Sequence, residues 1–376
     1  TALSLPDGAT IELVGTNVVT SDSSGTGLTR AISVSGAVTI SSTLGGRLTA
    51  TGGSTTDSSS YGIVANDVTI SGNAIVTAKG GAAYSSSYGI LATDVAIGGS
   101  ADVTATGGTA TTTGSYGISA YESLTVSGSA DVDAAGGTAG ASSRGIYVGT
   151  GGTGFTVGNT AAVRATGGAA PSESGGSHGI YVSENFTISG GANVDAAGGA
   201  NSYASNGITV YESLTVTDSA AVTATGNAAL DQSGSYSRGI YVQYNLTVSD
   251  RAVVNATGNA ANAGSYGIYT QNGILSIEGG EVTARGSTRA LLNSIYGGVY
   301  TVPNGYTYYV NTTTSPGGAA LTGDGATTVI DSTHKYARVS SPPPAYTLYL
   351  NNADGTLREN GQYDTVISTE MADAGA

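Results

Sequence analysis

The chain of 376 residues has no Cys, no Trp and only two Phe. Without Cys it can form neither a disulfide nor a thiolate nucleophile. Lys and Arg together number 12 against 26 Asp and Glu, which gives a formal net charge of −14. This balance disfavours nucleic acid and anionic membrane surfaces, because both bind clustered cations. We therefore expect no nucleic-acid partner.

Long apolar runs are also missing. No segment approaches the ~18 consecutive apolar residues of a membrane-spanning helix, so we expect no membrane insertion. No apolar stripe of period 3.6 persists, because Gly, Ser, Thr and Val dominate, and long helices are not expected. The chain begins at Thr1 and not at Met, so we expect a processed or truncated product.

A repeated unit occupies most of the chain. A small residue followed by an aliphatic one, usually Gly-Ile, recurs with a base period of 28 residues and insertions of three to six. A period of this length indicates one repeat architecture and not several separate domains. The aligned aliphatic residues are Ile32, Ile63, Ile90, Ile118, Ile146, Ile180, Ile208, Ile240, Ile268 and Leu291.

Each period holds three short segments of alternating polarity, of the forms "GIxV", "LTVSG" and "VTATGG". Alternation of period 2 indicates a half-buried strand. Three strands within ~28 residues suit one coil of a parallel β-helix, stacked at ~4.8 Å per coil. A β-propeller blade needs about 40 residues and four strands. We therefore predict an all-β parallel β-helix (β-solenoid) of about nine to ten coils, with three short strands per coil.

Glycine pairs close the third segment of most coils. In two copies the pair becomes Gly226-Asn227 or Gly258-Asn259. Asn tolerates the left-handed backbone region better than other non-glycine residues. The pattern therefore predicts positive φ at this corner.

The ends of the chain depart from the repeat. We predict an N-terminal cap with the first strands at 1–29, β-helix repeats at 30–286, and a closing coil with a C-terminal cap at 287–340. The segment 341–376 starts with the Pro-rich "SPPPAY", which indicates a stiff linker. Its remainder reads as a hairpin-like tail around Asp354-Gly355.

These coils, as in "SYGISAYESLTVSGSADVDAAGG", followed by "GYTYYVNTTTSPGGAALTGDG", resemble large bacterial cell-surface β-helix proteins. Such proteins are commonly labelled carbohydrate-binding-domain proteins and fall among the pectate-lyase-like β-helices. The resemblance covers roughly residues 30 to 340, and its motifs are structural. It implies a right-handed turn and a secreted or cell-surface location.

Tyrosines recur on the outward side of the first strand. Tyr147, Tyr181, Tyr241 and Tyr269 follow Gly-Ile, and a second column before the Gly holds Tyr61, Tyr88, Tyr116 and Tyr266. Arg144, His178, Asn206 and Arg238 interrupt that second column. Aromatic faces repeated at ~4.8 Å suit a polysaccharide lying along the coils. Alternatively, the rings stack on one another and cover the sheet.

The near-copies of "YESLTV" add an outward pair to each of two coils, which packing does not explain. We therefore predict a glycan platform that includes both pairs. Its residues are Tyr147, Tyr181, Tyr241, Tyr269, Tyr121, Tyr211, Glu122 and Glu212.

Acidic residues form a second candidate site. Asp102, Asp131 and Asp133 point outward around the third strand of adjacent coils, where their carboxylates could hold Ca²⁺. The alternative is a solvated charge column, with Arg164 between Asp133 and Asp195. We expect no other cofactor.

Catalytic residues do not assemble in the sequence. The two histidines, His178 and His334, lie far apart, and no Cys is present, so no nucleophile triad is visible. The leading hypothesis is a non-catalytic, adhesin-like protein that binds a polysaccharide or cell-surface glycan. The second is a structural stalk or filament subunit that self-associates end to end. A polysaccharide lyase or hydrolase is the third.

Overall fold

The computed structural model describes residues 1–21, 25–171, 175–200, 203–229, 234–293 and 299–342. Residues Thr1–Ser341 form one compact unit. Its described elements are strands without any helix, so none of them is a helix that could span a membrane. The predicted β-helix is confirmed, since the strands stack in parallel as a β-solenoid of about nine turns with about 29 residues each.

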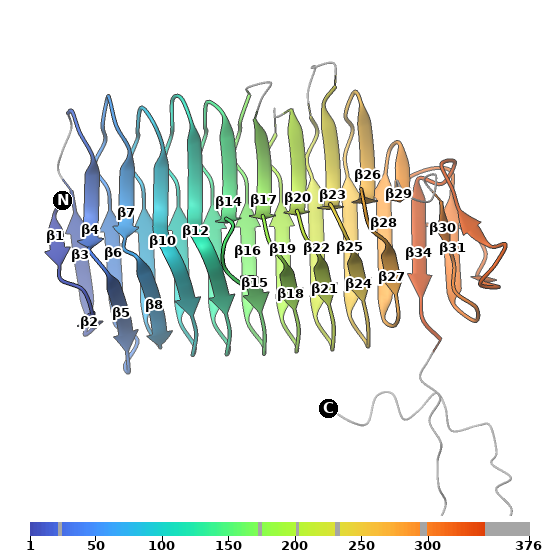
Figure 1. The fold of residues 1–376 in the computed structure, drawn as a ribbon, viewed down its shortest axis with the longest axis horizontal. Coiled ribbons are helices and arrows are strands. Elements are labelled where there is room, and N and C mark those ends of the chain that lie inside the picture. The colour runs from blue at the N-terminus through green and yellow to red at the C-terminus, as the bar shows by residue number, and fades with distance from the viewer. Residues whose placement is uncertain (22–24, 172–174, 201–202, 230–233, 294–298, 343–376) are drawn as a thin grey trace, which may run out of the picture. The chain divides into compact units, whose positions relative to one another are not determined.

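The first strands of the coils form one column (Figure 1). They are β1 (Leu3–Leu5), β4 (Thr29–Val34), β7 (Ser60–Val64), β14 (Ser142–Val148), β17 (Gly176–Val182), β20 (Ala204–Val210), β23 (Tyr236–Val242), β26 (Gly264–Thr270) and β29 (Arg289–Asn293). The second strands are β2 (Ala9–Glu12), β5 (Ala37–Ser42), β8 (Asp67–Gly72), β15 (Gly154–Val157), β18 (Phe186–Ile188), β21 (Leu214–Val216), β24 (Leu246–Val248) and β27 (Leu275–Ile277).

Two coils depart from the three-strand prediction. In β10 (Ser87–Ile97) and β12 (Gly114–Val126) the first and second segments run together as one strand, with a bulge in their register. These two strands join both columns into a single sheet of 19 strands. This sheet is called the front sheet below.

The third strands form a separate sheet, called the back sheet below. Its parallel members are β3 (Thr16–Thr20), β6 (Arg47–Thr51), β9 (Ile75–Lys79), β11 (Asp102–Thr106), β13 (Asp131–Ala135), β16 (Ala162–Thr166), β19 (Asn193–Ala197), β22 (Ala221–Gly226), β25 (Val253–Gly258) and β28 (Glu281–Gly286). In Figure 1 the near strands run downward while the chain advances from left to right and returns behind, which is a right-handed turn.

The core consists of ladders of like residues. Ile90, Ile118 and Ile146 are register partners on neighbouring coils and are fully buried. Phe155 and Phe186 stack inside the second column, with ring centroids 4.5 Å apart. Each coil thus buries its apolar side against the next, as a solenoid requires.

The Gly of each Gly-Ile pair lets the two sheets approach closely. A Cβ on Gly117 would lie 2.6 Å from the backbone N of Ala135 and 2.6 Å from the carbonyl O of Gly145. No side chain fits at such distances, so this glycine column sets the separation of the sheets.

The predicted positive φ at the Gly-Gly corner is wrong. Positive φ occurs instead at the corner after the second strand, at Gly72, Gly99, Gly128, Asn159, Gly190, Asp218, Asp250 and Gly280. The Gly-Gly corner needs glycine for space, because a Cβ on Gly81 would lie 2.4 Å from the carbonyl O of Gly53 on the previous coil. Asn227 is accommodated at the equivalent place, where its Nδ2 donates to the carbonyl O of Gly198 at 2.6 Å.

A ladder of buried serines, which we did not predict from the sequence, holds that corner. Ser115 Oγ donates to the carbonyl O of Gly108 at 2.6 Å and accepts from the backbone N of Gly137 at 2.7 Å. A serine with both bonds joins the corner before its strand to the corner after it, whereas Ser237 forms only the second of them, accepting from the backbone N of Asn259 at 2.9 Å. The ladder consists of Ser60, Ser87, Ser115, Ser143, Ser177, Ser205, Ser237 and Ser265, all fully buried.

Antiparallel strands cover the last parallel strand of the back sheet. β34 (Tyr336–Ser340) pairs with β28, and β31 (Thr307–Asn311) pairs with β34. The shorter strands are β30 (Tyr300–Thr301), β32 (Leu321–Thr322) and β33 (Val329–Ile330). An ion pair of 2.5 Å between Arg338 Nη2 and Glu281 Oε2 ties this cap to the solenoid. The predicted hairpin at Asp354-Gly355 lies outside the described residues.

Candidate functional site

A line of tyrosine rings crosses the outer face of the front sheet. It starts with Tyr61, Tyr88 and Tyr116, whose rings stack almost parallel at centroid distances of 5.2 and 5.0 Å. This spacing is close to the distance between neighbouring strands. The early part of the line is therefore a simple stack in which each ring covers the next.

Further along, the rings tilt away from one another. Tyr147 and Tyr181 are 5.6 Å apart at 38°, and Tyr181 and Tyr211 are 5.3 Å apart at 41°. Tyr241 contacts Tyr211 at 6.2 Å and Tyr269 at 5.5 Å, both nearly edge-on. The structure thus brings together these five predicted platform tyrosines. Tilted rings leave part of their faces uncovered by their neighbours.

Two arginines lie among the tilted rings. The guanidinium carbon of Arg144 lies 4.8 Å from the ring centroid of Tyr147 and 4.1 Å from that of Tyr181. Arg238 is placed in the same way, 4.9 Å from Tyr241 and 5.1 Å from Tyr269. Such distances are those of cation–π contacts.

His178 and Asn206 lie between the two arginines. The register runs from Arg144 to His178, Asn206 and Arg238 on four successive coils. His178 Nδ1 lies 3.0 Å from Thr209 Oγ1, and Asn206 Nδ2 donates to the same hydroxyl at 2.9 Å. The hydroxyl can then donate to the imidazole, which suits a neutral ring whose Nδ1 accepts.

Burial controls the charges of these groups. It lowers the pKa of His178 well below its ordinary value, and the cations of Arg144 and Arg238 lower that pKa further. Burial also raises the pKa of Tyr181 and of Tyr241. At neutral pH the imidazole is therefore uncharged and both phenols keep their protons.

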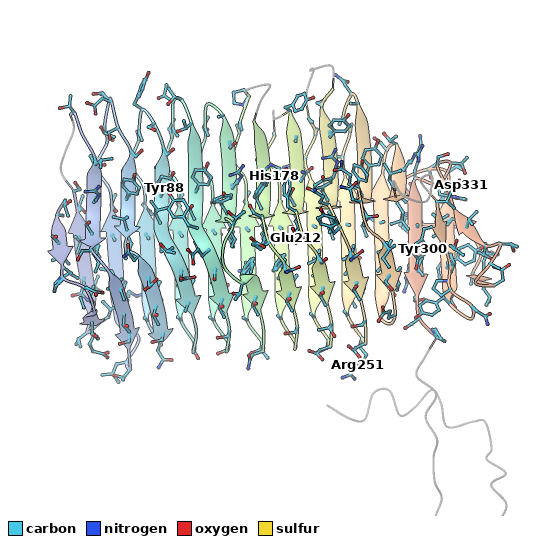
Figure 2. All side chains as sticks on the ribbon, in the orientation of Figure 1. Tyr88, His178, Glu212, Arg251, Tyr300 and Asp331 are labelled. Carbon is cyan, nitrogen blue, oxygen red and sulfur yellow. The ribbon has the colours of Figure 1, made fainter. Side chains whose placement is uncertain are left out.

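These residues line a groove of about 480 Å³. Its lining includes Arg144, His178, Tyr181, Asn206, Arg238 and Tyr241. Tyr203 and Gly175, which lie directly before the first strands of their coils, and Gly176, the first residue of β17, also line it. Among the described lining residues none is acidic. Figure 2 shows His178 on the near side of the front sheet, with Glu212 nearer the second strands.

Of the two predicted Tyr-Glu pairs, only Tyr211 lines the groove. Tyr121 and Tyr211 are 50% and 39% exposed. Glu122 and Glu212 are also exposed, and they do not line the groove. Tyr211 is therefore the member of the two "YESLTV" pairs that reaches the groove lining.

The acidic candidate site lies on β11 and β13 of the back sheet. Asp102 and Asp131 are register partners on β11 and β13, and Asp133 pairs with Thr104. Asp131 Oδ1 forms an exposed ion pair of 3.4 Å with Arg164 Nη1. In the described part of the chain, no three His, Cys, Asp or Glu side chains lie close enough together to hold a metal ion. The Ca²⁺ site at Asp102, Asp131 and Asp133 stays a prediction.

From the sequence we assigned no role to the four residues that interrupt the tyrosine column, Arg144, His178, Asn206 and Arg238. In the structure they form the polar floor of the groove. The available signal was the cluster itself, since four consecutive coils replace Tyr with a cation, an imidazole or an amide.

Comparisons with protein-family models, with curated proteins and with solved structures found no match to this chain.

Proposed function

We propose that this chain is a non-catalytic, secreted or cell-surface β-solenoid that binds a polysaccharide in the tyrosine and arginine groove. The observation that carries the proposal is the combination of tilted tyrosine rings with a polar floor in one groove. Sugars present apolar C–H faces to aromatic rings and hydroxyls to polar groups, so both surfaces of a sugar find partners there.

The direction of the groove supports a linear polymer. Its lining comes from β14, β17, β20, β23 and β26, five successive coils. Four strand spacings correspond to roughly 19 Å along the stacking axis. Several sugar units of an extended chain would fit along this length.

The secreted or surface location, the adhesin-like role and the carbohydrate-binding, pectate-lyase-like family belong to the same proposal. They are supported by the sequence resemblance, which extends over the coils that build the groove. A filament that grows by adding copies end to end has less support, because β34 already pairs with β28 at the end of the back sheet.

A paired set of variants tests this function. Tyr181→Ala/Tyr211→Ala removes two groove rings, and Tyr61→Ala/Tyr88→Ala removes two rings of the parallel stack as a control. On an array of bacterial and plant polysaccharides, we expect the groove variant to lose at least tenfold in affinity, because stacking on an aromatic ring contributes about 1 kcal/mol or more. Circular dichroism verifies that both variants are folded.

The control variant is expected to bind like the unaltered chain. The proposed function is wrong if the unaltered chain binds no polysaccharide, or if both double variants bind as well as it does.

A further inference from the structure

Among the residues that the structure describes, the two groove arginines have no acidic partner. In the described residues, Arg164 and Arg338 each form an ion pair with a carboxylate, whereas no ion pair or hydrogen bond reaches the guanidinium of Arg144 or Arg238. Their Nε atoms are buried without any hydrogen-bond acceptor. Both side chains are half-buried, and a charge that is partly withdrawn from water is normally paired.

The surroundings of these arginines show what they lack. Burial lowers the pKa of Arg238, because its guanidinium has lost part of its hydration. Tyrosine faces compensate part of this loss through cation–π contacts. Each guanidinium still has N–H donors arranged to hold two oxygens of one carboxylate or sulfate.

The groove floor between the arginines adds a further unpaired group. Asn206 is 2% exposed, and its Oδ1 has no hydrogen-bond partner. A ligand hydroxyl can donate to such an oxygen. Three strand spacings, roughly 14 Å along the stacking axis, separate the coil of Arg144 from that of Arg238. A ligand that satisfies both arginines must therefore carry at least two anionic groups.

We propose that the groove selects acidic polysaccharides, glycans that bear carboxylate or sulfate groups, and that Arg144 and Arg238 each bind one anionic group. Tyr181, Tyr211 and Tyr241 pack against the sugar rings between them. This inference rests on the proposed function and names the class of glycan.

The overall charge of the chain makes this selectivity informative. At a net charge of −14 the protein repels polyanions, so non-specific attraction cannot explain binding of an acidic polymer. Binding must come from a local cationic site. It should weaken as salt is added, because salt screens the arginine–anion attraction.

Matched polymers and matched variants test the inference in calcium-free buffer. The probes are soluble alginate chains, the same chains after carboxyl reduction, dextran sulfate and dextran. Arg144→Gln/Arg238→Gln removes both groove charges. Arg164→Gln/Arg251→Gln removes two exposed arginines outside the groove and is the charge-matched control. The alginate and dextran sulfate arms separate carboxylate from sulfate as the anionic group.

We expect the unaltered chain to bind at least one acidic polymer at least tenfold more tightly than its neutral counterpart. The groove double variant should lose about tenfold per arginine, since hydrogen bonds to charged groups have about that effect. The control should bind like the unaltered chain. Arg144→Lys/Arg238→Lys keeps the charges without the planar fork and should bind with intermediate affinity.

Three results would overturn the inference. Equal affinity for acidic and neutral polymers, with loss in Tyr181→Ala/Tyr211→Ala, refutes acidic selectivity but leaves the proposed function in place. Acidic selectivity that survives in folded Arg144→Gln/Arg238→Gln refutes the assignment to these arginines. Absence of binding to every polymer refutes the proposed function and this inference together.

Discussion

The early and the late coils build two different surfaces on the same front sheet. In the early coils, Tyr61, Tyr88 and Tyr116 stack in parallel, so each ring covers its neighbours. In the later coils, Arg144 and Arg238 stand at the same register position, the rings tilt, and a groove opens. The first strands pair in the same register in both, although the first and second segments run together in the coils of Tyr88 and Tyr116. The difference shows that the solenoid fixes positions, whereas a few outward side chains decide whether a position packs or binds.

The tyrosines were interpreted either as a glycan platform or as rings that stack on one another, and the two regions differ in which interpretation they favour. Self-stacking describes the early coils, where the interplanar angles are 2° and 10°. In the late coils, arginine occupies ring faces that another tyrosine would otherwise cover.

The largest expected effect concerns the glycine column that both regions share. Gly89→Val in the early coils would place a Cβ 2.6 Å from the back-sheet nitrogen of Thr106, and Gly179→Val in the groove coils would place one 2.5 Å from that of Ala197. We expect each to lower the free energy of unfolding by about 3 kcal/mol, because the sheets cannot separate locally without breaking their hydrogen bonds. Denaturant unfolding measures this loss.

A control for this pair is Gly25→Ala, where an added Cβ would meet nothing within 4 Å and should change stability little. If only one of the two substitutions lowered the free energy of unfolding, the glycine column would not set the separation of the sheets in both regions.

Removing a ladder serine should lower the free energy of unfolding somewhat less than the glycine substitutions do. Ser115→Ala and Ser177→Ala each leave one buried carbonyl O and one buried N–H without a partner. We expect about 2 kcal/mol of destabilisation in each region, with faster hydrogen exchange at the amides of Gly137 and Gly199. Ser100→Ala, at an exposed serine, is the control. Unchanged exchange at both amides would show that the serine bonds do not hold the corner.

The groove region alone should carry a pH dependence from His178. The pKa of His178 is lowered in the folded state. As the pH falls below about 6.5, the unfolded chain therefore binds a proton at this histidine that the folded chain does not bind. Stability should therefore decrease toward acid by up to about 1.4 kcal/mol per pH unit from this group. His178→Asn, which copies Asn206 on the next coil, should remove that component. The prediction is contradicted if the melting temperatures of the two proteins change with pH in the same way between about pH 7.5 and 5, roughly the range where an ordinary histidine titrates.

The smallest effect should come from the exposed ion pair on the back sheet. Arg164 and Asp131 are 58% and 53% exposed, so Arg164→Ala should change the free energy of unfolding by less than about 0.5 kcal/mol. Arg144→Ala, which loses contact with three tyrosine rings, should destabilise by about 1 kcal/mol or more. Equal losses would mean that the groove arginine is no better packed than a surface one.

The fold was predictable because repetition amplifies a weak signal. One "GIxV" segment is ambiguous, but the column from Ile63 to Ile268 recurs at a nearly constant period, and only stacked coils bury such a column. The corner glycines were misassigned, because glycine serves both positive φ and close approach, and the sequence does not distinguish the two reasons.

The site was predictable only in part. Tyr147, Tyr181, Tyr241 and Tyr269 were found because a strand alternates its faces, so their outward direction follows from the core pattern. The role of Arg144 and Arg238 could not be derived in that way. It depends on ring tilt and on a lining in which no described residue is acidic, and only the three-dimensional arrangement reveals either.

The serine ladder has a consequence for the electrostatics of the whole solenoid. A carbonyl can only accept and an N–H can only donate, so from Ser60 to Ser205 each hydroxyl hydrogen must point to the preceding corner. Six such bonds in succession share one direction, and bonds in a chain polarise one another. The interior of this solenoid therefore carries an aligned row of dipoles, with its positive end toward the first coils, in a structure whose sheets would otherwise contribute little net dipole.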